Sequence, residues 1–507
     1  MLTNTDFIAV GQSFPPVSEI PRIARYHDNQ LLFDGEFMSL YRDSWQEMLN
    51  AMDSYRDDLP GMIERFININ YFRLTSTAVA DLVCSEPPTI SAMVGEKIID
   101  LEPMLRKADF YKKLYNWVID ISRYGDSAQR VYKHAEKGVQ VATYDPSSVF
   151  AVVNPEDKDD ITCYVYAGVV EIPKSKGDTT YHLIVQKHYK GYYLASRYLL
   201  TPNASEVLFN RHTGQFLPKQ RTFTIKAVLE DEQRITTGID GIALSLLSQL
   251  KTSDTTYGHD DYTLFEDTVS SIIERLMQVN EILRRNAFPD MYGPDSAFKQ
   301  NSDGSYTLKS GHGDAWMLAE GDTPPGYVTY DGSLTACFEY IQLMFDQLYK
   351  LSEMGAVYQA NAGASNISYD TMRTSFIRPL AKAKRITNEI TSTLKQIIAE
   401  MTALSPDVDT VKADDITITW YDGLPNDERQ EIDKSTAKIN AGLTTPKREN
   451  VERFGMSPEQ AEQVDDEVRE YQADKSASMF GGFGSMNAEG EPLGEGGNEG
   501  GGDGNGT

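Results

Sequence analysis

The chain has 507 residues, more than one hydrophobic core normally supports, so we expect at least two packed units. Hydrophobic residues make up 40% of the sequence and aromatic residues 10%, an ordinary composition that excludes disorder along the whole chain. The formal net charge of −27 excludes a protein that grips nucleic acid tightly, because such affinity comes mainly from lysine and arginine that displace counterions from phosphates.

The cysteines and the apolar stretches indicate the cellular compartment of the protein. Cys84, Cys163 and Cys337 are far apart and form no CxxC pair, so we expect reduced, buried thiols in an intracellular product. The N-terminus lacks a basic start followed by an apolar run, and no apolar stretch approaches the roughly 20 residues that span a bilayer. We expect a soluble cytoplasmic protein or a component of a particle.

The first half of the chain is predicted to hold helices and then a block of strands. The opening 35 residues look irregular, a helical pattern then begins, and residues 110–122 repeat apolar side chains at steps of three and four. From about residue 128 the period changes to two. Segments rich in β-branched and aromatic residues predict seven antiparallel strands, at 128–134, 138–144, 147–153, 161–172, 180–189, 191–200 and 221–229.

The second half is predicted to be mainly helical. A helix over 264–287 carries apolar residues at spacings of four and three, typical of a helix packed lengthwise on others. Residues 290–331 are rich in turn residues, with two candidate strands, and a second helix of near-heptad spacing covers 334–354. Two such apolar seams need more partners than one chain offers, and closed cyclic packing would supply them.

An uncharged segment rich in alanine and glycine, residues 355–368, leads into a third and longer helix over 369–403. Pro379 lies inside this helix, where it removes a backbone hydrogen bond and is expected to cause a kink. A strand at 416–422, a polar helix at 426–441 and two short helices between 442 and 472 are predicted to follow. The fold class is therefore α+β and mainly helical.

The C-terminal tail differs in composition from the rest of the chain. Residues 456–507 hold 12 acidic against 2 basic residues, and 12 of residues 481–507 are glycine, so we expect the end of the chain to be disordered. The acidic balance suits simple solubility. It also suits a wall that surrounds DNA and repels it, which lets a polyanion slide.

No motif in the sequence indicates an enzyme. Glycine is never followed by lysine, so the phosphate-binding loop of a nucleotide hydrolase is missing, and HExxH and GxSxG are absent. Four acidic pairs could be read as nuclease metal ligands, but such pairs in acidic proteins are usually solvated: Asp159-Asp160, Asp260-Asp261, Asp414-Asp415 and Asp465-Asp466. We expect no catalysis, no metal and no cofactor.

Several segments, taken in order, resemble portal proteins of tailed bacteriophages, most closely those of long-tailed phages that infect Gram-positive bacteria. The order helix, turn-rich excursion, helix, uncharged loop and kinked helix resembles the stem, clip and tunnel of that family. The matching segments read YHDNQLLFDGEF, ININYFRLTSTAVADLVCSEPP, SSIIERLMQVNEILRRNAFPDMYGP, SLTACFEYIQLMFDQLYKLSEMG, SNISYDTMRTSFIRPLAKAKRI and ITWYDGLPNDERQEIDKSTAKINAGLTTPKRENVERFG. They span about residues 20–475. Where the family often has Ser-Gly, this chain has Ser368-Tyr369.

The resemblance implies the portal fold in a cyclic oligomer, a dodecameric ring at one capsid vertex with a channel along its axis. The implied parts are an N-terminal wing of helices and the β block (1–263), stem helix 1 (264–288), the clip (289–331), stem helix 2 (332–354), the tunnel loop (355–368), the kinked tunnel helix and a wing strand (369–425), the helical crown (426–474) and a disordered, acidic, Gly-rich tail (475–507).

The same resemblance implies the function and the partners. Double-stranded DNA would pass through the ring, without sequence preference, during packaging and ejection. The clip would dock the terminase and then the head-completion adaptor and tail proteins, and the wing would contact the major capsid and scaffolding proteins. The protein would be located in the virion at the portal vertex, after assembly in the host cytoplasm, with no membrane partner. The alternatives are another head-tail adaptor or minor capsid protein, and a packaging or DNA-processing enzyme, which the missing nucleotide loop disfavours.

Three groups of residues are candidate contacts. Polar residues of the uncharged loop could touch DNA without holding it, or the loop could simply face solvent: Gln359, Asn361 and Asn366. Basic residues of the third helix could contact DNA or a neighbouring subunit, or could pair with the chain's many acids, which its composition favours: Arg378, Lys382, Lys384 and Arg385. In the clip, Trp316 and Lys309 are candidate partner contacts, and local packing is the alternative for Trp316.

Overall fold

The computed structural model describes residues 2–41, 45, 68–95, 97–174, 179–203, 207–210, 215–218, 222–287, 290–302, 304–308, 318–328, 334–358, 374–421, 435–454 and 461–471. The chain divides into two units, residues 1–424 and 425–507. None of the helices in these ranges is long and apolar enough to cross a bilayer.

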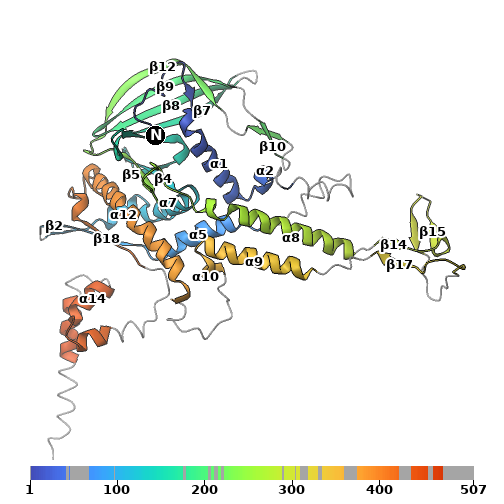
Figure 1. The fold of residues 1–507 in the computed structure, drawn as a ribbon. Helices are drawn as coiled ribbons and strands as arrows, with labels where there is room; N and C mark the ends of the chain where they lie inside the picture. Colours follow the sequence, from blue (N-terminus) through green and yellow to red (C-terminus); the bar gives the residue numbers. More distant parts are fainter. Residues whose placement is uncertain are drawn as a thin grey trace, which may run out of the picture. The chain divides into compact units, whose positions relative to one another are not determined.

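The first unit contains both helices and strands (Figure 1). Its helices are α1 (Ile20–Asp34), α2 (Phe37–Tyr41), α5 (Tyr71–Cys84), α6 (Glu102–Lys107), α7 (Phe110–Tyr124), α8 (Glu266–Ala287), α9 (Thr335–Leu351), α10 (Gly355–Tyr358) and α12 (Ile377–Leu404), with short 3-10 turns that include η3 (Tyr262–Leu264) and η5 (Ala413–Asp415). Its strands are β1 (Ser13–Phe14), β2 (Thr89–Val94), β3 (Lys97–Ile99), β4 (Asp126–His134), β5 (Gly138–Tyr144), β6 (Val149–Asn154), β7 (Asp157–Pro173), β8 (Thr179–Tyr189), β9 (Tyr192–Pro202), β10 (Val207–Asn210), β11 (Gln215–Pro218), β12 (Phe223–Thr236), β13 (Leu244–Ser248), β14 (Asp290–Tyr292), β15 (Phe298–Gln300), β16 (Tyr306–Leu308), β17 (Gly326–Val328) and β18 (Ile416–Thr419).

The largest sheet is antiparallel, with strand order β1-β12-β9-β8-β7-β6. Alternate residues of its strands point to one face and form a hydrophobic core with Ile8 and Phe14 of the N-terminal segment. The other face packs on a second sheet of order β13-β4-β5, where Tyr144 and Tyr166 stack with ring centroids 4.5 Å apart. The seven predicted strands are therefore confirmed, but they belong to two sheets rather than one block.

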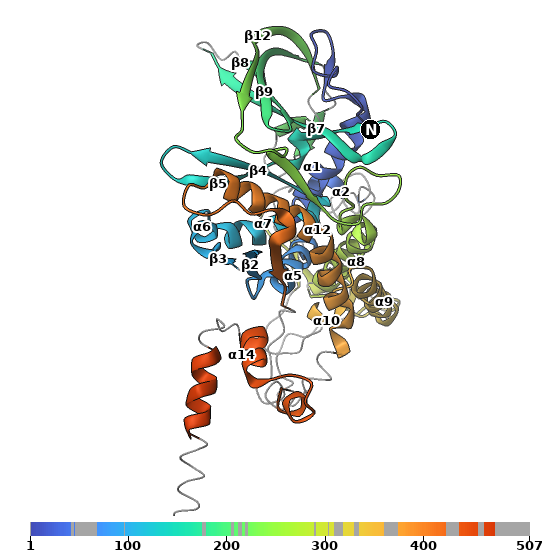
Figure 2. The ribbon, with the colours of Figure 1, turned by 90° about the vertical axis from the view of Figure 1, so that its left-hand side faces the viewer.

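Three helices lie beyond the second sheet and form the main core of the unit (Figure 2). In α7 the residues spaced by three and four are fully buried, and the indole nitrogen of Trp117 donates a hydrogen bond of 2.7 Å to the hydroxyl of Thr143 on β5. Helix α5 begins at the capping residue Asn70, whose side chain accepts from the backbone amide of Arg73. Helix α12 packs on α5 and on β4 and β13.

Two glycines allow the chain to cross itself where α7 ends. Gly125 has a φ of +85°, and a Cβ built on Gly258 would lie 2.2 Å from the carbonyl oxygen of Gly125. No larger residue fits at position 258 without a backbone shift. The crossing brings Asp260 and Asp261 against the end of α7, where the backbone amide of Asp261 donates to the carbonyl of Ser122.

Helices α8 and α9 run side by side away from the sheets, and the short strands of the turn-rich region lie at their far end (Figure 1). β14 pairs with β17 and β15 with β16. Residues 290–302, 304–308 and 318–328 of this region thus hold four strands where two were predicted, because three-residue strands are too short to show a period.

Two other predictions are corrected. The N-terminal segment predicted to be irregular contains β1 and α1; of the 15 residues of α1 only Tyr26, Asn29 and Leu32 are buried, so its apolar pattern is sparse. The kink predicted inside the third helix is a break before it, because α12 begins at Ile377 and Pro379 lies in its first turn. A turn at Phe376 separates α12 from the helical residues 374–375. Pro379 has no amide for the carbonyl four residues earlier, that of Ser375, which accounts for the interruption.

The second unit is described over residues 435–454 and 461–471. It contains α14 (Pro446–Phe454), flanked by helical segments at 435–440 and 461–471. Lys447 and Glu462 form an ion pair of 3.1 Å, and the hydroxyl of Ser435 donates to Glu449 over 2.8 Å. The two short helices predicted between residues 442 and 472 are confirmed over the described ranges.

Candidate functional site

The four basic residues singled out in the third helix lie in the first three turns of α12, and they have different surroundings. Arg378 and Lys384 are exposed, whereas Lys382 is buried and Arg385 is partly buried. Arg378 lines a pocket of about 430 Å³ between the end of α9 and the start of α12, together with Asp346, Lys350 and Glu353. Their proposed contact with DNA or a neighbouring subunit stays a prediction.

Lys382 forms the most buried ion pair of the described region with Asp261. Its ammonium nitrogen lies 3.0 Å from Oδ1 of Asp261, and the two side chains are 4% and 5% exposed. The same nitrogen donates a hydrogen bond of 3.1 Å to the backbone carbonyl of Ser352, the C-cap residue of α9. A buried ammonium is costly unless it is paired and hydrogen-bonded, and both conditions are met here.

Asp261 is held by a polar network of its own. The hydroxyl of Ser122 donates to Oδ2 over 2.6 Å, and the side-chain amide of Gln249 donates to Oδ1 over 3.2 Å. The hydroxyls of Ser122 and Ser76 are 3.0 Å apart, and that of Ser76 is 2.7 Å from Tyr262. Burial raises the pKa of Tyr262 well above its usual value, so this phenol stays neutral. The network joins α5, α7 and the segment that leads into α8.

Two further contacts join the end of α9 to its surroundings. Arg385 of α12 forms an ion pair of 2.5 Å with Glu353, and these side chains are 36% and 26% exposed. The hydroxyl of Tyr358, at the end of α10, is hydrogen-bonded to Thr75 of α5. Burial raises the pKa of Tyr358 to about 12. Helix α10 occupies the start of the segment predicted to be a loop.

Helix α9 has apolar residues on two sides. Ile341 and Leu348 are buried, and Leu348 packs with residues of α8. Tyr340, Leu343 and Leu351 are 41%, 51% and 38% exposed. At 3.6 residues per turn these three lie on one side of the helix, about 100° from the buried pair. Arg275 of α8 lies 5.9 Å from the centroid of the Tyr340 ring, so Leu343 and Leu351 are the more open part of this stripe.

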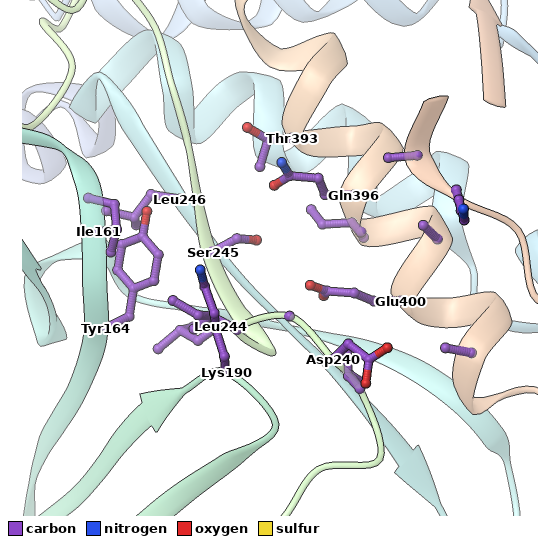
Figure 3. Close-up of a pocket in the computed structure, with 18 of the residues that line it drawn as sticks. Ile161, Tyr164, Lys190, Asp240, Leu244, Ser245, Leu246, Thr393, Gln396 and Glu400 are labelled. Carbon is purple, nitrogen blue, oxygen red and sulfur yellow. The ribbon is translucent and has the colours of Figure 1, made fainter. Parts of the chain in front are cut away.

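A groove of about 590 Å³ lies between the C-terminal half of α12, β7 and the loop before β13 (Figure 3). Lys190, Asp240 and Glu400 project into it from three separate segments. Burial raises the pKa of Glu400 to about 8, which keeps this carboxyl mostly protonated at neutral pH. Within the described ranges, no cluster of three or more His, Cys, Asp or Glu side chains could hold a metal ion.

The sequence did not single out Asp261, the partner of Lys382. Asp260 and Asp261 were interpreted as a solvated acidic pair, but Asp260 accepts from Arg25 and Asp261 from Ser122 and Gln249. The candidates Gln359, Asn361, Asn366, Lys309 and Trp316 lie outside the described residues.

The comparison with protein families matches a part of the first unit. Residues 25–186 match the family described as phage portal protein, SPP1 Gp6-like. This range runs from α1 through most of β8 and includes α5 and α7 of the main core. No curated protein sequence matches the chain.

Solved structures give weaker likenesses. A structure titled as the virion of a native gene transfer agent (GTA) particle is 11% identical, with a TM-score of 0.41, over 76% of this chain and 90% of that one. The neck of an empty GTA particle, computed with C6 symmetry, is 10% identical with a TM-score of 0.43, over 80% and 94%. The neck of the native particle, computed with C12 symmetry, is 11% identical with a TM-score of 0.42, over 78% and 92%. TM-scores this low carry no argument by themselves. The family match therefore indicates that residues 25–186 are similar to phage portal proteins.

Proposed function

We propose that the chain assembles into a closed ring in which α8 and α9 of neighbouring copies pack around an axial channel for double-stranded DNA. The observation that carries this proposal is the second apolar stripe of α9, formed by Tyr340, Leu343 and Leu351. One side of α9 is already covered by α8. A cyclic arrangement offers each copy two different neighbours, so that the exposed stripe is covered on every subunit without leaving an open end.

The net charge of the chain favours weak rather than tight contact with DNA. The net charge is −27, and on α9 the acidic residues Glu339 and Asp346 lie near the exposed Lys350 on a third side of the helix. An acidic surface displaces few counterions when DNA approaches, so the ring would let DNA slide in either direction. In this proposal the channel binds DNA weakly and without sequence preference.

The parts of the chain take the roles that the family resemblance implies. Residues 1–263 and β18 form the wing, which contacts capsid and scaffolding proteins, and α8 and α9 form the stem. Residues 289–331 form the clip, which docks the terminase during packaging and the head-completion adaptor afterwards. Residues 426–474 form the crown, and the ring is a dodecamer in the virion, at the portal vertex. The protein itself performs no catalysis.

Negative-stain electron microscopy and mass photometry of the purified full-length protein test the proposal. We expect rings with a central hole and a mass that is an integral multiple of the 56.8 kDa subunit. Monomers that persist at high concentration would contradict it. An ATPase or nuclease activity that copurifies with the rings through several columns would contradict the passive role.

A further inference from the structure

Three segments that are far apart in the sequence meet at one buried ion pair. Asp261 lies just before η3 and α8, Ser352 ends α9, and Lys382 lies in the second turn of α12. The ammonium group of Lys382 bridges the other two, at 3.0 Å from Oδ1 of Asp261 and 3.1 Å from the carbonyl of Ser352. We call these three residues the stem joint. The joint thus connects the near end of both stem helices to the start of α12.

Because the stem joint is buried, its ion pair and hydrogen bond are satisfied in only one arrangement of the three segments. Both charged side chains are almost fully removed from solvent, so water cannot replace a partner that moves away. The neighbouring Arg385–Glu353 pair also links α9 to α12, but it is partly exposed, and pairs of that kind contribute little. Lys382 is therefore the most buried polar link between α12 and the end of α9, beside the apolar packing of Met354 and Phe376 on the main core.

The rest of α12 is anchored differently. Ile386, Ile390, Leu394 and Ile397 are buried in the main core with α5 and α7. Before Lys382, Ile377 and Arg378 are exposed, whereas Pro379 is buried and Phe376 packs against the main core. Loss of the joint would therefore loosen the first turns of α12 more than the remainder, which stays packed.

We infer that Lys382 is a positioning residue that fixes the start of α12 to the ends of the stem helices, so that a movement of the stem is transmitted to α12 while DNA passes. This inference rests on the proposed function as a DNA conduit. It assigns to Lys382 a role through its partners rather than a direct contact with phosphate.

The test compares the double variant Lys382→Met/Asp261→Asn with wild type in the full-length protein. The side-chain amide that the second substitution introduces can still accept from Gln249 and donate to the hydroxyl of Ser122, so no charge is left buried. Lys395→Met is the matched control, because it removes a cation farther along the same helix that is not among the candidate DNA contacts. The measurements are hydrogen exchange of residues 377–386 and the DNA content of particles assembled with each variant.

We expect amides of residues 377–386 in the double variant to exchange at least tenfold faster than in wild type, with exchange of α5 and α7 unchanged, and particles to contain less DNA. Lys382→Arg, which keeps the cation, should restore both readouts in part, and Lys395→Met should match wild type. Wild-type exchange in the double variant would overturn the inference, as would faster exchange with a normal DNA content. If the double variant does not fold, Lys382→Met alone carries the same two measurements, because the carboxylate of Asp261 keeps its hydrogen bonds from Ser122 and Gln249, and wild-type values would again overturn the inference. Failure of the wild-type protein to form rings would refute the conduit, and the exchange result would stand apart from it.

Discussion

Leu343 and Leu348 lie on the same helix, and substitutions at these two positions distinguish the stability of the subunit from the stability of the ring. Leu348 is fully buried against α8, whereas Leu343 is about half exposed in the single chain. Replacing each by alanine removes the same atoms. Leu348→Ala should act on folding, and Leu343→Ala should act on assembly.

The magnitudes follow from burial. Truncating a fully buried leucine costs about 2–5 kcal/mol, because the lost transfer free energy is joined by a cavity. Burying an exposed leucine completely is favourable by about 1.5–3 kcal/mol, and closure of the ring can bury only the half of Leu343 that is still exposed. Leu343→Ala therefore weakens each subunit interface by about 1 kcal/mol. This corresponds to roughly a fivefold change in the affinity of each interface.

In a closed ring every interface carries the same substitution, so the subunit concentration at half-assembly should rise by roughly fivefold. Leu343→Asp places a carboxylate in the interface and should prevent closure altogether. Mass photometry over a dilution series measures assembly, and thermal unfolding of the dissociated subunit measures folding. The control is Glu339→Gln, which changes a charged position of α9 outside the exposed stripe.

Two results would refute this reasoning. If Leu343→Asp rings assemble at the wild-type concentration, the exposed stripe of α9 is not the subunit interface. If Leu343→Ala lowers the melting temperature of the isolated subunit as much as Leu348→Ala does, the two sides of α9 do not have the separate roles assigned to them.

Three further predictions address the first unit and the tail. Gly258→Ala should destabilise the subunit by about 3 kcal/mol in thermal unfolding, because the new Cβ meets the backbone oxygen of Gly125; an unchanged melting temperature would show that this crossing can relax. Burial raises the pKa of Glu400 from 4.5 to about 8, so the folded state holds a proton that the unfolded state releases, and stability should fall as pH rises between these values. Glu400→Gln removes this dependence, so its melting temperature should exceed that of wild type by more at pH 8 than at pH 5; a constant difference would contradict the burial argument. Truncation after Asp474 should leave ring formation intact in electron microscopy, and failure to form particles would show that the tail does more than keep the protein solvated.

Sequence periodicity predicted the elements that have one face against a core. Apolar residues of α7 recur at steps of three and four because one side of that helix faces the main core. In the strands from β4 to β9, apolar and polar residues tend to alternate because successive side chains point to opposite faces of the sheet. The division of these strands between two sheets was not predictable, because pairing depends on contacts such as β4 with β13, more than 100 residues apart. Local sequence carries no record of such pairing.

The sequence drew attention to Lys382 as a basic residue of the third helix, but not to Asp261 as its partner. Lys382 was identified because it is one of several basic residues in a short stretch. Asp261 could not be distinguished from other acidic pairs, since its burial is produced by the Gly125–Gly258 crossing and by the hydroxyl of Ser122. A carboxylate becomes a structural partner only through tertiary packing of this kind.

Helices α7 and α9 of the first unit differ in how many of their residues are buried within a single chain. In α7, 8 of 15 residues are buried, and in α9 only 2 of 17. Because apolar burial is the main source of stability, the main core supports its own folding, whereas α9 depends on its packing against α8. The stem joint lies at the boundary between these regions. In the ring that we propose, a joint placed there would hold a stem that neighbouring subunits complete to a core that is complete in itself, so the stem could adjust without unfolding the subunit.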